Sequence, residues 1–251
     1  MSAKQTIQTA VEKVAQLRQE AIKTPGLLEA VSHIKAFQAK RFTGTYFDLL
    51  HTSQYKPATQ FFLEELYSEK DYSQRDAQFS RIAGTLARMF PAQVVQTAVS
   101  LARLHSLTED LDLAMAKSYL NSAVSNTGND NLIKRYIFAW RDVGRRHDRE
   151  AQLSGALNVG EELITLTHTP GLRMALKIMR KPATLAGMAA LQHFLESGFD
   201  TFAAMGNKEK NTVNYFLTTV EMREKKLIDE LFRDSFSDAK DTITDIMNKA
   251  T

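Results

Sequence analysis

The chain has 251 residues, of which 43% are hydrophobic and 24% are charged, the balance of a globular protein with a substantial core. It contains no cysteine, which excludes disulfide frameworks, thiolate zinc sites and thiol catalysis. The net charge of +3 indicates no particular partner. Neither a secretory signal nor an apolar stretch long enough for a transmembrane segment is found, so we expect a cytoplasmic protein.

Helical periodicity begins near the N-terminus. Apolar side chains recur at three- and four-residue steps from Ile7 to Ala21, which predicts an amphipathic helix capped by Ser2. Thr24 and Pro25 then predict the N-cap and the first residue of a second helix, which continues to about residue 50. Further helices are expected to start at Pro57, Ser73 and Pro91.

The second half of the chain follows the same pattern after "SNTGNDN" at 125–131, whose composition is typical of a loop. Thr169 and Pro170 predict another helix start, Pro182 interrupts or restarts that helix, and Ser235 begins a short final one. No alternating strand pattern is found. We therefore predict an all-α protein, a bundle of about nine or ten helices that forms one domain over residues 1–251.

Three phrases occur twice in the same order, which predicts an internal duplication with a pseudo-twofold arrangement. The repeat halves would be residues 24–124 and 169–232. Independent reuse of common helix-start signals is the alternative explanation. The paired phrases are "TPGLLEA" (24–30) with "TPGLRMA" (169–175), "KPAT" at 56–59 and 181–184, and "ATQFFLEELY" (58–67) with "ALQHFLESGF" (190–199).

Metal and nucleophile motifs are weak. A carboxylate-bridged di-iron bundle needs Glu-x-x-His on two helices, and this spacing is absent, as are His-Glu-x-x-His and Gly-x-Ser-x-Gly. Haem needs only one histidine, so spacing leaves a haem- or metal-dependent redox enzyme open as an alternative function. The metal ligands and cofactor stay unknown, and the histidines flanked by apolar residues are His33, His105, His168 and His193.

The segment "YSQRDAQFSRI" at 72–82 is densely polar. Arg75 and Arg81 are candidates to bind an anion or a partner protein. The alternative, which we favour, is that Arg75 and Asp76 form a partly buried ion pair that anchors this helix to its neighbour.

Residues 170–205 combine basic and apolar side chains in the most suggestive way. Arg173, Lys177 and Lys181 follow an i, i+4, i+8 path, and no acidic residue occurs between Leu163 and Leu195. Methionine-rich apolar surface beside a cationic stripe suits an amphipathic anion. The predicted apolar lining is Met179, Met188, Phe194, Phe199 and Phe202. The ordinary alternative is a core helix pair with a solvated basic face.

We therefore predict a non-catalytic protein that binds an apolar or amphipathic anionic ligand, such as a fatty acyl or lipid molecule. The same pattern fits a membrane surface, or a scaffold that docks a partner protein through the basic helix. The tail from Ser235 is a candidate for homo-oligomerisation. Nucleic-acid binding is not expected, because the aromatic residues of the basic segment 134–149 are expected on the buried side of a helix and no DNA- or RNA-binding motif accompanies them.

Two long segments carry a resemblance to a known family. "FFLEELYSEKDYSQRDAQFSRI" (61–82) and "ALKIMRKPATLAGMAALQHFLESGFDTFAAM" (175–205) resemble an uncharacterised group of bacterial helical proteins, a domain of unknown function. The resemblance covers most of the chain. It implies a helical, cytosolic bacterial protein and transfers no activity, cofactor or catalytic residue.

Overall fold

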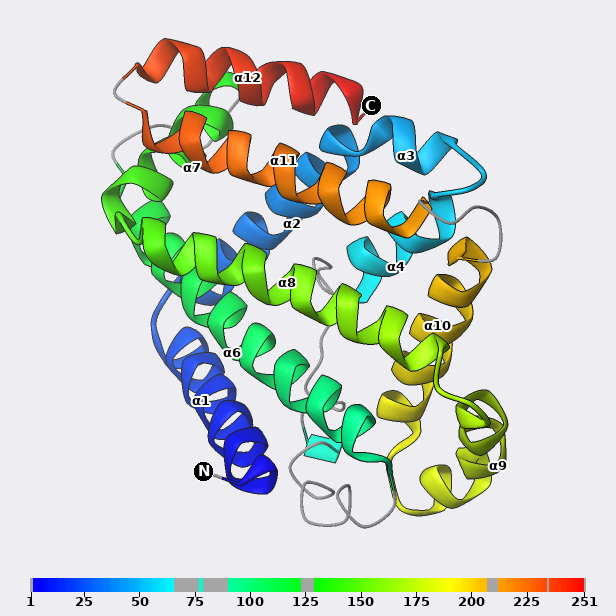
Figure 1. Ribbon diagram of the computed structural model, residues 1–251. Coiled ribbons are helices and arrows are strands. Elements are labelled where there is room, and N and C mark those ends of the chain that lie inside the picture. Colours follow the sequence, from blue (N-terminus) through cyan, green and yellow to red (C-terminus); the bar gives the residue numbers. More distant parts are fainter. Residues whose placement is uncertain are drawn as a thin grey trace.

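A computed structural model describes residues 2–65, 77–78, 90–122, 129–206, 212–233 and 235–250. Within these ranges the chain forms eleven helices and no strand (Figure 1). The predicted all-α class is confirmed, with one or two helices more than expected. The predicted cap Ser73 and the polar residues Arg75, Asp76 and Arg81 lie outside the described residues.

The helices form a bundle around α6 and α8, which pack side by side through the middle of the molecule (Figure 1). α1 packs along α6, and α12 packs on α2 and α7 at one end. α9 and α10 lie toward the other end. The bounds are α1 Ala3–Lys23, α2 Leu27–Thr45, α3 Phe47–His51, α4 Lys56–Glu65, α6 Ala92–Asn121, α7 Asn129–Val143, α8 Arg146–Thr167, α9 Leu172–Leu185, α10 Ala189–Gly206, α11 Thr212–Phe232 and α12 Phe236–Lys249.

Several predicted helix ends are confirmed. Ser2 forms a capping box with Gln5 at the start of α1, and the side chain of Ser235 accepts a hydrogen bond from the backbone of Asp238 in α12. Pro91 immediately precedes α6. Pro182 does not break its helix, because it lies in the last turn of α9, which ends three residues later.

The repeated phrase Thr-Pro-Gly-Leu forms the same turn at both sites. Gly26 has φ 75° and ψ −11°, and Gly171 has φ 74° and ψ −8°. In each copy the leucine N–H donates to the threonine carbonyl, at 3.1 and 3.2 Å. This geometry is a type II turn, which favours proline at its second position and glycine at its third. The helices therefore begin after the glycine, and the prediction that Thr-Pro forms the N-cap and first helical residue was wrong.

The second repeated phrase takes different positions in its two copies. "KPAT" opens α4 at 56–59 but forms the end of α9 at 181–184. The shared turn is thus explained by local turn chemistry, and the duplication itself stays a prediction.

A single apolar core joins helices from both halves of the chain. Its aromatic centre links α4, α10 and α11: the rings of Phe61 and Phe194 lie 5.3 Å apart, and those of Phe62 and Phe216 lie 5.4 Å apart. Of the helices that the structure describes, none combines the length and the hydrophobicity that a membrane crossing requires.

Candidate functional site

Helix α9 is the element on which the predicted cations lie, and it is held to the bundle by one narrow apolar stripe. Leu172, Leu176 and Ala183 are buried, and Met179 is half-buried. The stripe packs on α10 and α8. The side-chain amide of Gln192 reinforces this contact by donating to the carbonyl of Leu176 at 2.6 Å.

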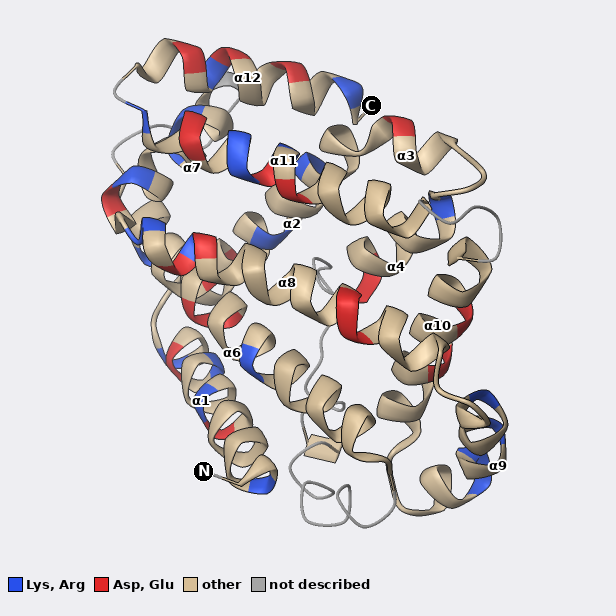
Figure 2. Ribbon diagram, in the orientation of Figure 1, with Lys and Arg blue, Asp and Glu red and all other residues tan. Residues whose placement is uncertain are grey.

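The basic residues of α9 divide into two groups. Arg173 pairs with Asp200 at 3.0 Å, and Arg180 pairs with Glu196 at 2.7 Å, so both arginines are tied to α10. Lys177 and Lys181 are exposed, and neither has an ion-pair partner among the described residues. Figure 2 shows Lys and Arg on α9 without any Asp or Glu. The lysines are therefore the cations available to an outside anion.

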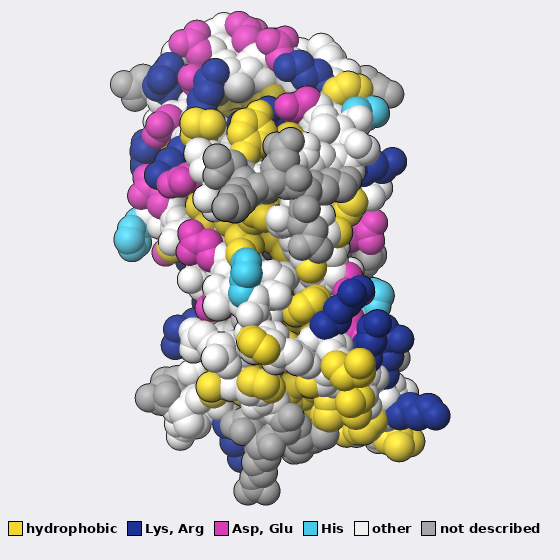
Figure 3. All heavy atoms as spheres, turned by 45° about the vertical axis from the view of Figure 1, so that its right-hand side comes forward, with side chains coloured by type: hydrophobic (Ala, Val, Ile, Leu, Met, Phe, Trp, Pro, Cys, Tyr) yellow, Lys and Arg dark blue, Asp and Glu magenta, His cyan; other side chains and the backbone are white. Residues whose placement is uncertain are grey.

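The side of α9 that faces solvent is apolar as well as basic. Met174, Ile178 and Leu185 are 63%, 67% and 90% exposed. At about 100° per residue they lie within an arc of about 40°, opposite the buried stripe. In Figure 3, hydrophobic and basic side chains adjoin one another at the lower end of the molecule, where Figure 1 places α9. Exposed large apolar side chains gathered in this way are typical of an interaction surface.

The other predicted lining residues lie inside the core. Met188, Phe194, Phe199 and Phe202 are all at most 5% exposed. Phe194 and Phe202 pack on the ring of Phe61, with centroids 5.3 and 6.3 Å away. The structure therefore does not bring these four side chains together with the cations on one surface. Sequence reasoning missed Met174 and Leu185, although their spacing from Ile178 was a usable signal.

The second basic segment, 134–149, uses its arginines within the protein. Arg135 and Arg149 are buried and lie over the rings of Tyr119 and Trp140, at 3.6 and 4.2 Å from the centroids. The remaining arginines bind groups of α6, α8, α11 and the turn before α12: Arg141 donates to the carbonyls of Leu231 and Ser235, Arg145 pairs with Asp110 and Asp148, and Arg146 pairs with Glu150 and Asp229. These contacts give the segment a structural role.

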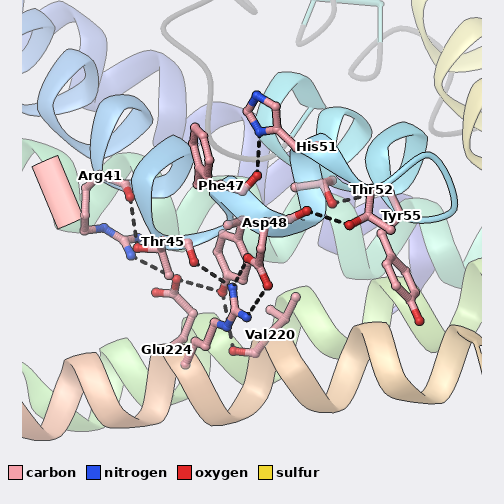
Figure 4. Close-up of polar contacts among 12 residues, drawn as sticks. Arg41, Thr45, Phe47, Asp48, His51, Thr52, Tyr55, Val220 and Glu224 are labelled. Atoms are coloured by element: carbon pink, nitrogen blue, oxygen red, sulfur yellow. Dashed lines mark hydrogen bonds and ion pairs between the residues drawn. The ribbon is translucent and has the colours of Figure 1, made fainter. Parts of the chain in front are cut away.

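A buried ion pair joins α2 to α11, and sequence reasoning did not find it. Figure 4 shows Arg41 and Glu224 facing each other, with a nitrogen–oxygen distance of 2.9 Å. The hydroxyl of Tyr46 donates to the same carboxylate at 3.0 Å. Burial alone would lower the pKa of Arg41, but the charge of Glu224 raises it above its ordinary value. Arg41 therefore stays charged inside the protein.

Asp112 is a second buried carboxyl, on α6. It accepts a hydrogen bond from Gln38 at 2.8 Å. Burial raises the pKa of Asp112. The positive charges of Lys35 and Arg149 oppose this rise in pKa, and the negative charge of Glu109 adds to it. Since Asp112 is 3% exposed, a substrate reaches it only if the helices separate. We assign it to the core and not to a reaction site.

The direction of this shift predicts a pH dependence of stability. A carboxyl whose pKa is raised by folding binds its proton more tightly in the folded protein, so its ionisation destabilises the fold as the pH rises through the folded-state value. We expect the Asp112→Asn variant to be more stable than the wild type at about pH 7, with the difference shrinking as the pH falls toward about 4. Urea unfolding over this range measures the difference.

Asp110 serves as the control for this experiment. Burial alone would raise the pKa of Asp110. The hydrogen bonds from Arg145 and Lys13 outweigh the effect of burial, so the pKa of Asp110 lies below its ordinary value. Asp110→Asn should therefore be less stable than the wild type at about pH 7 and approach it in acid. If Asp112→Asn were the less stable variant at about pH 7, the carboxylate of Asp112 would be ionised and favourable in the folded state.

Metal and haem chemistry find little support in the described residues. No three His, Asp or Glu side chains within this part of the chain gather as metal ligands would. His33, His168 and His193 are exposed, and His105 is half-buried.

An open depression of about 510 Å³ lies along α1, between Ala15 and Thr24. Its charged lining residues are one carboxylate, Glu20, and one amine, Lys23.

Comparison with known proteins places the chain in a family. Residues 16–237 match a family described as "Domain of unknown function (DUF8198)", which is most of the chain. The chain belongs to this family. The resemblance to an uncharacterised helical family is thereby confirmed. Neither a curated protein nor a solved structure matches the chain. The DUF8198 region includes the whole of α9, while nearly all of α12 lies beyond it.

Proposed function

We propose that this protein is a non-catalytic binding protein that takes up an anionic amphiphile on α9. The observation that carries the proposal is the exposed apolar stripe of Met174, Ile178 and Leu185, beside two lysines that have no ion-pair partner in the part of the chain that the structure describes. An amphiphile has an apolar chain and a charged head. The stripe and the lysines supply a matching surface for each.

The two parts of the surface contribute differently. Burying the three apolar side chains would contribute roughly 5 kcal/mol if each supplies about 1.5–2 kcal/mol. The translational and rotational freedom lost on association costs a similar free energy, about 4 kcal/mol or more. Net binding then depends on Lys177 and Lys181, whose flexible stems lie along apolar surface while their amines meet the anionic head.

The core residues of the original ligand hypothesis take a supporting role in this proposal. Phe194, Phe199 and Phe202 belong to α10 and, with Met188, are part of the core that holds α10, the helix on which α9 packs. Arg173 and Arg180 hold α9 to α10 through their carboxylate partners. In this proposal the ligand contacts Met174, Ile178 and Leu185 instead.

A bacterial origin and a cytoplasmic location belong to the same proposal. The lack of cysteine supports a reducing compartment. The redox enzyme finds no specific support in the histidine positions. A scaffold function, in which α9 docks a partner protein, would use the same surface. The calorimetry described next distinguishes that function from amphiphile binding.

Titration calorimetry with dodecyl phosphate, below its micelle concentration, tests the proposal. We expect the wild type to bind and the Lys177→Gln/Lys181→Gln variant to bind roughly five- to tenfold more weakly, because each exposed charge contact contributes up to about 1 kcal/mol. Lys225→Gln/Lys226→Gln on α11 changes the net charge equally and should bind as the wild type does. Absence of wild-type binding, or equal losses in the two variants, contradicts the proposal.

A further inference from the structure

Across the outward face of α9, basic and apolar side chains lie in separate rows. From α10 outward come the paired arginines, then Lys177 and Lys181, then the apolar stripe. At about 100° per residue, the lysines lie between the arginines and the stripe. The charged groups, from Arg173 to Lys181, therefore border the apolar surface along one edge.

This face is convex. Met174, Ile178 and Leu185 lie on the side of α9 opposite its buried stripe, and Figure 1 places α9 at the edge of the molecule, outside α8 and α10. From Met174 to Leu185 the stripe is about 16 Å long at 1.5 Å per residue. A convex ridge of this length touches a single acyl chain along one side only, whereas an extended surface covers the ridge along its whole length.

The side chains on the ridge suit lipid better than protein. Protein interfaces concentrate their binding energy in Trp, Tyr and Arg, and lysine is depleted from their centres. The ridge has no aromatic residue, and its arginines are already paired with Asp200 and Glu196. Its cations without an ion-pair partner among the described residues are lysines. Helices that lie in a membrane interface combine basic residues with apolar side chains that enter the boundary between head groups and acyl chains.

We infer that α9 binds the surface of an anionic bilayer, with Met174, Ile178 and Leu185 entering the interface and Lys177 and Lys181 contacting the head groups. Charge complementarity selects the anionic surface, because residues 164–194 contain no acidic side chain that would repel it. This inference rests on the proposed function and narrows its ligand from any anionic amphiphile to an assembled lipid surface.

The absence of cysteine allows a direct test. An environment-sensitive dye on the single cysteine of Ile178→Cys reports whether α9 enters lipid, and Ile22→Cys, at a 56% exposed position on α1, is the matched control. With vesicles of phosphatidylcholine and phosphatidylglycerol we expect a blue shift for the dye at 178 and none at 22. Vesicles of phosphatidylcholine alone should give neither, and added salt should reverse the shift.

Vesicle sedimentation of the unlabelled protein gives the second measurement. The Lys177→Gln/Lys181→Gln variant should partition about 25-fold more weakly than the wild type, since each basic residue near an anionic surface contributes about fivefold. The Lys225→Gln/Lys226→Gln variant should match the wild type. An unshifted dye at 178, or equal partitioning of the two lysine variants, overturns the inference. If dodecyl phosphate still binds in a lysine-dependent way while vesicles do not, the proposed function stands and the bilayer is excluded.

Discussion

Replacing Arg41 with methionine is expected to lower the free energy of unfolding by about 3–5 kcal/mol, the largest effect among the changes considered. Arg41 is 3% exposed and Glu224 is 7% exposed. Without Arg41, the hydroxyl of Tyr46, at 3.0 Å, would be the one hydrogen-bond donor left to the carboxylate of Glu224 among the described residues. A buried charge that has lost its partner is among the most destabilising defects in a core.

The same reasoning predicts that the two changes compensate. Glu224→Leu alone should cost about as much as Arg41→Met, whereas the double variant should recover most of the loss, because two apolar side chains replace the pair. Urea unfolding of the wild type, both single variants and the double variant gives the coupling energy. If the double variant lost the sum of the two single effects, the ion pair would not be the source of their instability.

Arg223 and Asp48 provide a matched control for this cycle. They join α11 to α3, with two hydrogen bonds of 2.6 and 2.7 Å. Their side chains are 32% and 56% exposed, so water replaces each partner when it is removed. Arg223→Met should therefore cost no more than about 1 kcal/mol.

Replacing Gly44 with alanine is expected to dislodge α12. A Cβ atom at this position would lie 1.9 Å from the carbonyl oxygen of Ile246 and 2.8 Å from its carbonyl carbon. Both are backbone atoms of α12 and cannot rotate away, so the two helices must move apart. We expect the free energy of unfolding to fall by about 1–3 kcal/mol or more. Hydrogen exchange should accelerate in α12 more than in α6 or α8.

Gly155 is the control for this substitution. It lies inside α8, and the nearest atom to an added Cβ is the Cδ1 of Leu104 at 3.3 Å, which belongs to a flexible side chain. Gly155→Ala should be close to neutral, because the small clash is offset by about 1 kcal/mol of helix propensity. Wild-type exchange rates in the Gly44→Ala variant would show that α12 tolerates a wider separation from α2.

Local features of this protein were predictable from its sequence. The all-α class, the cap at Ser2 and the helix after Ser235 depend on residues three or four positions apart, which a linear pattern displays. The starts of α2 and α9 were placed too early because the Pro-Gly pair was not recognised as a type II turn. That signal was also local, and the positive φ of Gly26 and Gly171 is its physical basis.

Other features were decided only by the tertiary structure. Periodicity shows that α9 is amphipathic, but not that its solvent face carries a second apolar stripe, because exposure depends on which helices cover it. Arg135 and Arg149 are buried in segment 134–149, whereas Arg173 and Arg180, which look similar in the sequence, are exposed on α9. Arg41 and Glu224 are 183 residues apart in the chain, and their side chains meet only in the folded protein. Local patterns account for the helices and for caps such as Ser2. Packing between distant segments settles which charges face water, because burial and ion pairing are properties of that packing.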